Sequence, residues 1–297
     1  MSKRMMKKAI SLSLATLACA ASVATFTGCK SARPEVKMEI SFNGNVYEVQ
    51  YVLYRQIAPS TVAHFMTLVE HKYYDGLCIH DYDASANRMY TGAYKYDTAA
   101  AENVNGLVYQ KYYDIVKEYK EFPTTVWTGK KGEEGSKALY TLYGEFEANH
   151  YSVKKGSLLS QTFGSLTMYY TDKGDVEKEA IYVNPINTNE WERYYEYEQN
   201  SATSQFFISL NTTSKKDSAY CTFATPTEDG KDELEDLMED IQEYIEEHHS
   251  DDDDEFVKDV TVDINRDDAF AANEEQVTTY DVPKMPIVIN SIKVTKY

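Results

Sequence analysis

The chain has 297 residues, a formal net charge of −18 at pH 7 and a mean hydropathy of −0.54. An acidic surplus of this size argues against binding to nucleic acid and against charge-driven binding to an anionic membrane surface. Most of the surplus lies between residues 228 and 259, where seventeen acidic residues occur with two lysines. The spacing of Cys and His predicts no zinc site, and we expect neither a metal nor a cofactor.

The N-terminus has the features of an export signal. Basic residues precede an apolar run, residues 9–26, that is too short and too weakly hydrophobic for a comfortable membrane span. The run ends in Thr27-Gly28-Cys29, which resembles the lipobox of bacterial lipoproteins, where the Cys is lipidated and becomes the first mature residue. We therefore predict a lipoprotein signal peptide at 1–28, lipid attachment at Cys29, a tether at 29–35 and location on the extracytoplasmic face of the cell membrane. A plain secretory signal and an uncleaved anchor are the alternatives.

A β-hairpin and a helix are predicted next. Residues 36–54 alternate between apolar and polar side chains on both sides of an Asn43-Gly44-Asn45 turn, which is a hairpin pattern. Pro59 suits the first turn of a helix, and the apolar residues that follow recur at helical spacing up to Val69. These apolar residues are expected to fill the core.

Residues 201–210 alternate in the same way and predict a strand. Phe206 and Ile208 would face the core, whereas Gln205 and Phe207 would lie on an accessible face. An amide beside an exposed ring suits a bound peptide, because the amide pairs with backbone groups and the ring supports an apolar side chain such as proline. An ordinary half-buried strand is the alternative.

The remaining elements follow in order along the chain. The clearest helix is predicted at residues 232–247, where apolar residues lie on one face and acidic residues on the other. An acidic linker is expected at about 249–259, and residues 286–294 form a final strand. Cys78 and Cys221 would remain after export and form either one disulfide or two separate buried thiols.

Four blocks, in this order, resemble the cyclophilins, the cyclosporin-binding family of peptidyl-prolyl cis-trans isomerases. They are the helix at 58–69 with Tyr73-Tyr74-Asp75-Gly76 after it, Gly144-Glu145-Phe146 with Gly156-Ser157-Leu158-Leu159-Ser160, the strand Ser204-Gln205-Phe206-Phe207-Ile208, and Phe223 before the acidic helix. The resemblance covers most of residues 36–297.

The resemblance implies a mainly β fold, a closed eight-stranded antiparallel β-barrel capped by two helices. The last strand would pair beside the N-terminal hairpin. Two insertions interrupt the family pattern. The first, at about 94–143, has a helical stretch at 108–122, and the second, at about 161–199, has a hairpin-like pattern in which residues 166–170 pair with residues 180–183.

The resemblance also places catalytic residues at His80, Asp81, Gln205 and Phe207. Active cyclophilins carry an arginine after this histidine. Its hydrogen bond to the prolyl nitrogen localises the lone pair and stabilises the twisted amide, which lowers a rotational barrier of ~18–20 kcal/mol. Asp81 stands at the arginine position, and an ionised Asp only accepts hydrogen bonds. Isomerase activity is therefore expected to be weak or absent.

The substrate-binding positions depart from the family as well. Met89 and Gly92 match the motif Phe-Met-x-Gln-Gly-Gly, whereas Arg88, Thr91 and Ala93 replace its Phe, its Gln and its second Gly. Arg88 could supply the missing guanidinium from the neighbouring strand. The alternative is an exposed arginine that is simply solvated.

Tyr220 stands where the family has His or Tyr, and Lys215 and Lys216 stand where it has apolar walls. Two functions are therefore considered. One is a surface isomerase that acts on a proline-containing peptide or an unfolded exported protein. The other is a catalytically dead surface lipoprotein that binds peptide or glycan. A structural or adhesive lipoprotein is a third reading.

Overall fold

The chain divides into two compact units, residues 1–30 and 31–297. A computed structural model describes only parts of the second unit, namely residues 31–119, 126–127, 134–135, 141–149, 151–153, 156–170, 180–183, 193–196, 201–249, 255–263 and 277–297. The predicted signal peptide and Cys29 lie outside the described residues. Within those residues, none of the helices combines the length and the apolar character that a bilayer crossing requires.

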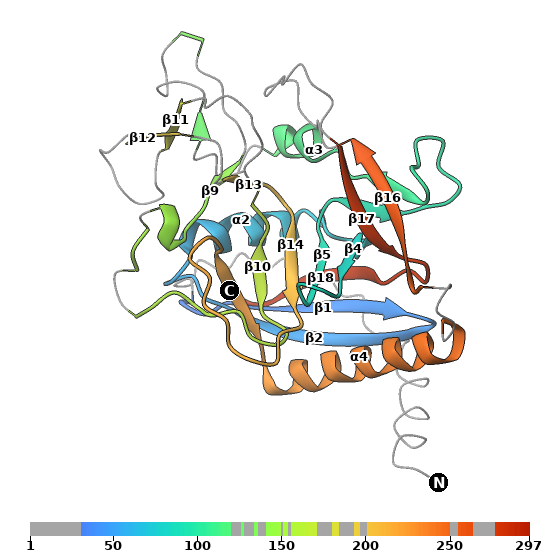
Figure 1. The fold of residues 1–297 in the computed structure, drawn as a ribbon. Coiled ribbons are helices and arrows are strands. Elements are labelled where there is room, and N and C mark those ends of the chain that lie inside the picture. The colour runs from blue at the N-terminus through green and yellow to red at the C-terminus, as the bar shows by residue number, and fades with distance from the viewer. Residues whose placement is uncertain are drawn as a thin grey trace, which may run out of the picture. The chain divides into compact units, whose positions relative to one another are not determined.

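The second unit is mainly β with few helices, and its largest sheet is curled and antiparallel (Figure 1). In spatial order, this sheet runs β4 (Asp81–Asp83), β5 (Arg88–Thr91), β14 (Phe206–Ser209), β10 (Leu166–Met168), β15 (Thr222–Pro226), β2 (Asn45–Leu53), β1 (Glu35–Phe42), β18 (Val288–Lys296), β3 (Leu77–Cys78), β6 (Tyr94–Tyr96) and β7 (Leu107–Tyr109).

The predicted N-terminal hairpin and final strand are confirmed. Strands β1 and β2 pair up to Phe42 and Asn45, and the turn between them holds Asn43 and Gly44 at positive φ, as a tight hairpin turn requires. Strand β18 pairs antiparallel with β1. Alternate residues of β1 are fully buried, so the sequence alternation matches the burial of its two faces.

Two long helices pack against this sheet. Helix α2 (Pro59–Glu70) buries its apolar face, and helix α4 (Glu228–His248) lies along β2 (Figure 1). Thr227 caps α4, since its hydroxyl accepts a hydrogen bond of 3.1 Å from Gly230 N. A Cβ on Gly230 would lie 2.4 Å from the Gln50 carbonyl oxygen, so the close approach of α4 to β2 requires glycine here.

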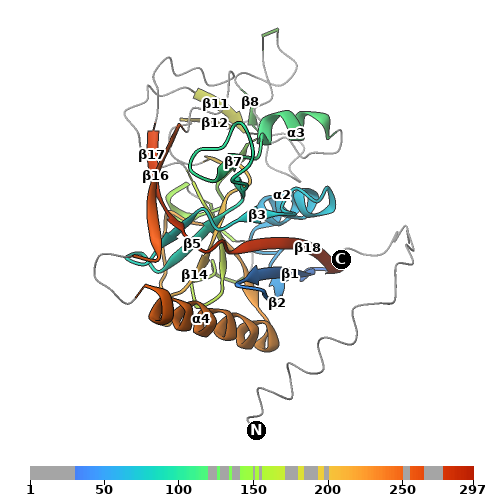
Figure 2. The same ribbon diagram turned by 90° about the vertical axis from the view of Figure 1, so that its right-hand side faces the viewer.

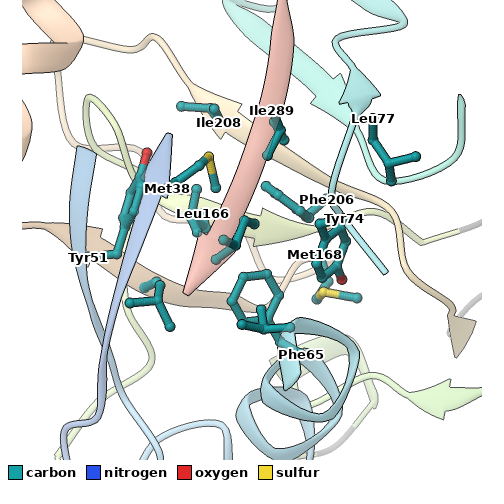
Figure 3. Packing of buried hydrophobic residues seen from close by; sticks show 14 of the residues in the cluster. Met38, Tyr51, Phe65, Tyr74, Leu77, Leu166, Met168, Phe206, Ile208 and Ile289 are labelled. Carbon is teal, nitrogen blue, oxygen red and sulfur yellow. The ribbon is translucent and has the colours of Figure 1, made fainter. Parts of the chain in front are cut away.

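The hydrophobic core lies between α2 and the sheet (Figure 3). The Phe65 ring of α2 packs at 5.7 Å from Phe206 and 5.1 Å from Phe223, measured between ring centroids. Aromatic side chains bury large areas, so these contacts supply much of the stabilisation of the core. The alternation of residues 201–210 therefore predicted the core face of β14 correctly.

The pairing predicted for the second insertion is wrong. Residues 166–168 form β10, which lies between β14 and β15 in the main sheet. Residues 180–183 form β11 (Ala180–Val183), which pairs with β12 (Arg193–Glu196) and β8 (Val126–Trp127). A short apolar run predicts a strand but not its partner, which is why the two runs appeared to form a hairpin.

In the first insertion the predicted helix is present but shorter. It is α3 (Tyr112–Glu118), and it follows the β6–β7 pair. The remaining small elements are a bridge between β9 (Leu142–Tyr143) and β13 (Ser201–Ala202), and a 3-10 helix at Glu147–Asn149.

A C-terminal hairpin was not predicted. Strands β16 (Val257–Asp263) and β17 (Val277–Pro283) pair with each other (Figure 2), and β17 packs against β4. The expected acidic linker therefore ends before residue 257, and residues 250–254 of it lie outside the described part of the chain. Cys78 and Cys221 are both buried free thiols, so they form no disulfide with each other.

Candidate functional site

Three neighbouring strands position the predicted site. Tyr90 of β5 lies directly opposite Asp81 of β4 on one side and Phe207 of β14 on the other. Residues that are directly opposed across a ladder point to the same face of a sheet. Asp81, Tyr90 and Phe207 therefore form one row on the outer face, while Met89 and Ile208 belong to the core cluster on the inner face.

Phe207 is fully buried, so the predicted accessible ring is wrong. The Arg88 guanidinium carbon lies 4.4 Å from the Phe207 ring centroid, and the rings of Tyr90 and Tyr220 lie at 5.3 and 5.5 Å. Alternation along a strand predicts the direction of a side chain but not what covers it. Here the neighbouring strand and a distant tyrosine cover the ring.

Arg88 is only 7% exposed, which excludes the solvated arginine considered above. One terminal nitrogen, Nη1, donates to the Tyr90 hydroxyl at 3.1 Å, and Nη2 donates to Gln161 Oε1 at 3.5 Å. The guanidinium also lies 4.9 Å from the Tyr220 ring centroid. It is therefore held between two aromatic rings, an arrangement in which the positive charge meets the negative ring faces.

Asp81 is engaged by the C-terminal hairpin. Its Oδ1 accepts a hydrogen bond of 3.0 Å from Asp281 N of β17. Burial raises the pKa of Asp81 to about 6, even though the bond from Asp281 favours the ionised form. The charges of Asp281 and Asp83 raise this pKa further. The residue predicted to replace the family's catalytic arginine is therefore a partly buried carboxyl group.

His80 is fully buried beneath the same hairpin. Its ring centroid lies 4.9 Å from that of Tyr280 and 5.0 Å from that of Tyr94, both in edge-on contact. Tyr280 and Asp281 therefore contact the predicted catalytic pair, although they are two hundred residues away in the sequence. Nothing in the pattern of residues 258–280 pointed to this contact.

A comparison with known protein families identifies the family of this chain. The family model described as "Cyclophilin type peptidyl-prolyl cis-trans isomerase/CLD" matches residues 36–265, which is more than half of the chain. The chain belongs to the cyclophilin family.

Similar solved structures include two of a cyclophilin-type peptidyl-prolyl cis-trans isomerase from Cryptosporidium parvum, the second in the presence of the dipeptide Ala-Pro. They share 14% and 13% identity with this cyclophilin, with TM-scores of 0.42 and 0.41. Each alignment covers 89% of this chain and 99% of the other. No curated protein matches the chain.

The remaining site residues of this cyclophilin are divided between the two faces of the sheet. Thr91 Oγ1 donates to the Cys78 carbonyl oxygen at 2.8 Å, so it links two strands. Met89 packs in the core. Gln205 precedes β14 and is only 7% exposed, so the prediction that its amide lies on an accessible face is wrong as well. Its backbone carbonyl accepts from Tyr169 N at 3.0 Å. The structure thus brings Arg88 and Tyr220 to Phe207 but not Met89 or Thr91, and their roles in binding stay predictions.

Two residues around Arg88 were not singled out from the sequence. Tyr90 could have been, because it alternates with Arg88 on the same strand. Gln161 carries no local signal, since it lies in a loop far along the chain. Its backbone is bridged to Lys215 by two hydrogen bonds of 2.8 Å. Lys215 and Lys216 are exposed beside this bridge.

Gly92 explains one feature of the motif that the chain retains. Its φ of +96° favours glycine, and an added Cβ would lie 2.4 Å from the Ser204 carbonyl oxygen. The end of β5 therefore approaches the start of β14 too closely for a side chain. This glycine is needed for strand packing, whatever the chain binds.

Proposed function

We propose that this cyclophilin binds extended, proline-containing segments of exported proteins at the extracytoplasmic face of the cell membrane, held there by lipid on Cys29, with weak or no isomerase activity. The observation that carries the proposal is Asp81. A carboxyl group bonded to the backbone of Asp281 occupies the position of the family's catalytic arginine. A carboxylate cannot donate to a prolyl nitrogen, so the usual stabilisation of the twisted amide is missing.

We infer in addition that the main sheet closes into an eight-stranded barrel. The segment that joins β3 to β4 is hydrogen bonded on both sides, because Ile79 N donates to the Ile287 carbonyl at 2.9 Å and His80 N donates to the Tyr90 carbonyl at 3.0 Å. These bonds link the β18 side of the sheet to β5. Closure would place His80 and Gln205 on neighbouring parts of one cylinder, as the family requires.

Arg88 does not simply replace the missing cation. Its guanidinium lies against the face of Phe207, where a prolyl ring would have to stack, and Nη1 is already bonded to Tyr90. A proline can reach Phe207 only if Arg88 moves. This coverage favours the second candidate function, a catalytically dead binding module for peptide or glycan.

The deciding experiment is an isomerase assay on a proline peptide with the mature protein. We expect wild-type activity to be at least ~100-fold below that of an ordinary cyclophilin measured alongside, which is the usual cost of one lost transition-state donor. The double variant Asp81→Arg, Arg88→Phe restores both family residues and should raise the activity. Wild-type activity equal to that of an ordinary cyclophilin would refute the proposal.

Two further measurements separate the candidates. Slow but measurable turnover of a proline peptide supports a weak isomerase, whereas peptide binding without measurable turnover supports the binding module. Activity that is present in the wild type and lost in Arg88→Ala would instead show that Arg88 supplies the guanidinium.

A further inference from the structure

The Arg88 guanidinium is a buried cation with no anionic partner in the described part of the chain. It is 7% exposed, and it contacts the Tyr90 hydroxyl, the Gln161 amide oxygen and Tyr220, none of which is an acidic side chain. Buried charges in proteins are nearly always paired, because an isolated charge loses its hydration without compensation. The missing anion is the feature that calls for an explanation.

The nearest acidic residue in the ladder does not supply it. Asp83 lies directly opposite Arg88. However, its Oδ1 accepts from Ser85 Oγ at 2.6 Å and from Ala86 N at 2.7 Å. The carboxylate therefore closes its own turn, and the structure forms no ion pair between it and Arg88.

Two donors at this place also lack acceptors among the described residues. They are Arg88 Nε and Gln161 Nε2, both buried. The amide and the guanidinium are neighbours, since Arg88 Nη2 donates to the oxygen of the same Gln161 amide. Buried donors normally have partners, so a pair of adjacent orphans indicates an acceptor from outside the described part of the chain.

We propose that Arg88 and Gln161 recognise a carboxylate on a bound peptide. A carboxylate supplies both the missing charge and several acceptor positions, and a guanidinium binds it in a planar, two-bond geometry. Phe207 and Tyr220 hold the guanidinium plane by contact with their rings. The inference rests on the proposed peptide-binding function, and names an acidic residue or a C-terminus as what the peptide must carry.

The surroundings favour an anion despite the overall charge of −18. Lys215 is tied to Gln161 by paired backbone bonds, and the exposed Lys216 follows it. Both positions would be apolar in a site that selects for a prolyl ring alone. Two exposed lysines therefore lie on the segment whose backbone pairs with Gln161, the residue that contacts Arg88, and positive charge on this segment attracts a negatively charged group.

The first test follows the Arg88 Nε–H signal by NMR in the mature protein. The probes are N-acetyl-glutamate methylamide, its glutamine counterpart, and N-acetyl-alanine, which carries its carboxylate at the C-terminus. We expect the glutamate probe or N-acetyl-alanine to shift the signal and the glutamine probe to leave it unchanged. The responses of the two carboxylates distinguish an acidic side chain from a peptide C-terminus. Equal responses to glutamate and glutamine, with none to N-acetyl-alanine, would overturn the proposal.

The second test measures the affinity of peptides that contain Glu-Pro or Gln-Pro. We expect Arg88→Met and Gln161→Met each to weaken binding of the Glu peptide about tenfold or more, which is 1.4 kcal/mol or more. The matched control is Arg33→Met, because Arg33 also lies over a tyrosine, 5.3 Å from the Tyr54 ring centroid, but is exposed. It should leave binding unchanged. Unaltered binding by both site variants would contradict the assignment.

The outcomes also separate this inference from the proposed function. If the carboxylate probes shift Arg88 while no proline peptide binds, the proposed function fails and the carboxylate site stands. If proline peptides bind with no preference for Glu over Gln, the carboxylate site fails and the proposed function stands. Gln161→Met keeps the test decisive if Arg88→Met does not fold.

Discussion

Two buried charged residues, Glu145 and Arg88, differ in the partners that the fold gives them. Glu145 is 5% exposed, and its carboxylate accepts from Ser60 N at 3.0 Å and from Thr61 N and Oγ1, both at 2.8 Å. These donors lie at the N-terminus of α2, where the helix dipole also favours an anion. Arg88 is buried to a similar degree, but among the described residues it has no acidic partner, and its Nε has no acceptor.

This difference indicates a structural role for Glu145 and a binding role for Arg88. Glu145 finds all of its partners within the chain, and it belongs to the Gly-Glu-Phe block that first indicated the family. Burial raises the pKa of Glu145, and the hydrogen bonds from Thr61 and Ser60 offset part of that rise. Arg88 has no acidic partner among the described residues and keeps a buried donor, Nε, without an acceptor, and a buried donor left unsatisfied by the fold points to a ligand.

The largest expected change in the free energy of unfolding is for substitution of Glu145, the charge whose hydrogen-bond partners are all within the chain. Glu145→Ala removes the acceptor of three hydrogen bonds at the start of α2 and leaves buried donors without partners. We expect the free energy of unfolding to fall by about 3–5 kcal/mol. Urea denaturation measures it, with the exposed neighbour in Glu147→Ala as control. A loss no larger than in the control would remove the contrast with Arg88.

The second effect concerns pH. Because the pKa of Asp81 is raised from 3.8 to about 6 in the folded protein, folding favours its protonated form. Stability from this group is therefore fully present below about pH 4 and is lost as the pH rises to about 6 and above. After allowance for its partial exposure, the loss is about 1–2 kcal/mol.

Asp81→Asn isolates this contribution, because the amide oxygen still accepts from Asp281 N but the group does not titrate. We expect the difference in the free energy of unfolding, variant minus wild type, to be larger at pH 7.5 than at pH 4.5. Urea denaturation midpoints at the two pH values measure it. Asp97→Asn is the matched control, since Asp97 is exposed and also accepts a backbone bond, from Ala99 N at 2.8 Å. Parallel pH profiles for Asp81→Asn and the wild type would contradict the expectation.

A smaller change in the free energy of unfolding is expected for substitution of Arg88. Arg88→Met loses the ring contacts but also removes a buried cation that has no anion. These terms oppose each other, so the free energy of unfolding should change by no more than about 1 kcal/mol. Thermal and urea unfolding measure it. A loss as large as that of Glu145→Ala would show that Arg88 is a structural residue and would break the comparison.

The smallest effect is expected for Arg33→Met. Its guanidinium also lies over a ring, that of Tyr54, but it is exposed to solvent. We expect a change of about 0.5 kcal/mol or less in the free energy of unfolding. Comparison with Arg88→Met shows how the contribution of a ring-stacked arginine to the free energy of unfolding differs between a buried and an exposed position.

Much of the fold could be predicted from local patterns. The hairpin of β1 and β2, the helices α2 and α4, and the final strand β18 each have a regular alternation or helical period over many residues. Strand β10 was predicted, but its pairing was wrong, because a strand of three residues carries no information about its partner. The hairpin of β16 and β17 failed because its two strands are separated by a segment without a readable pattern.

The sequence by itself determined the family, the order of the main elements and the replacement of the catalytic arginine by Asp81, because these depend on residue identity and on periods that repeat within a single element. Only the tertiary structure decided that Arg88 covers Phe207, that Asp81 bonds to Asp281, and that Gln161 reaches Arg88. Each of these contacts joins segments that are distant in the chain or on different strands. Their meeting depends on how the sheet curls and on what packs over its outer face, and no local pattern encodes that packing.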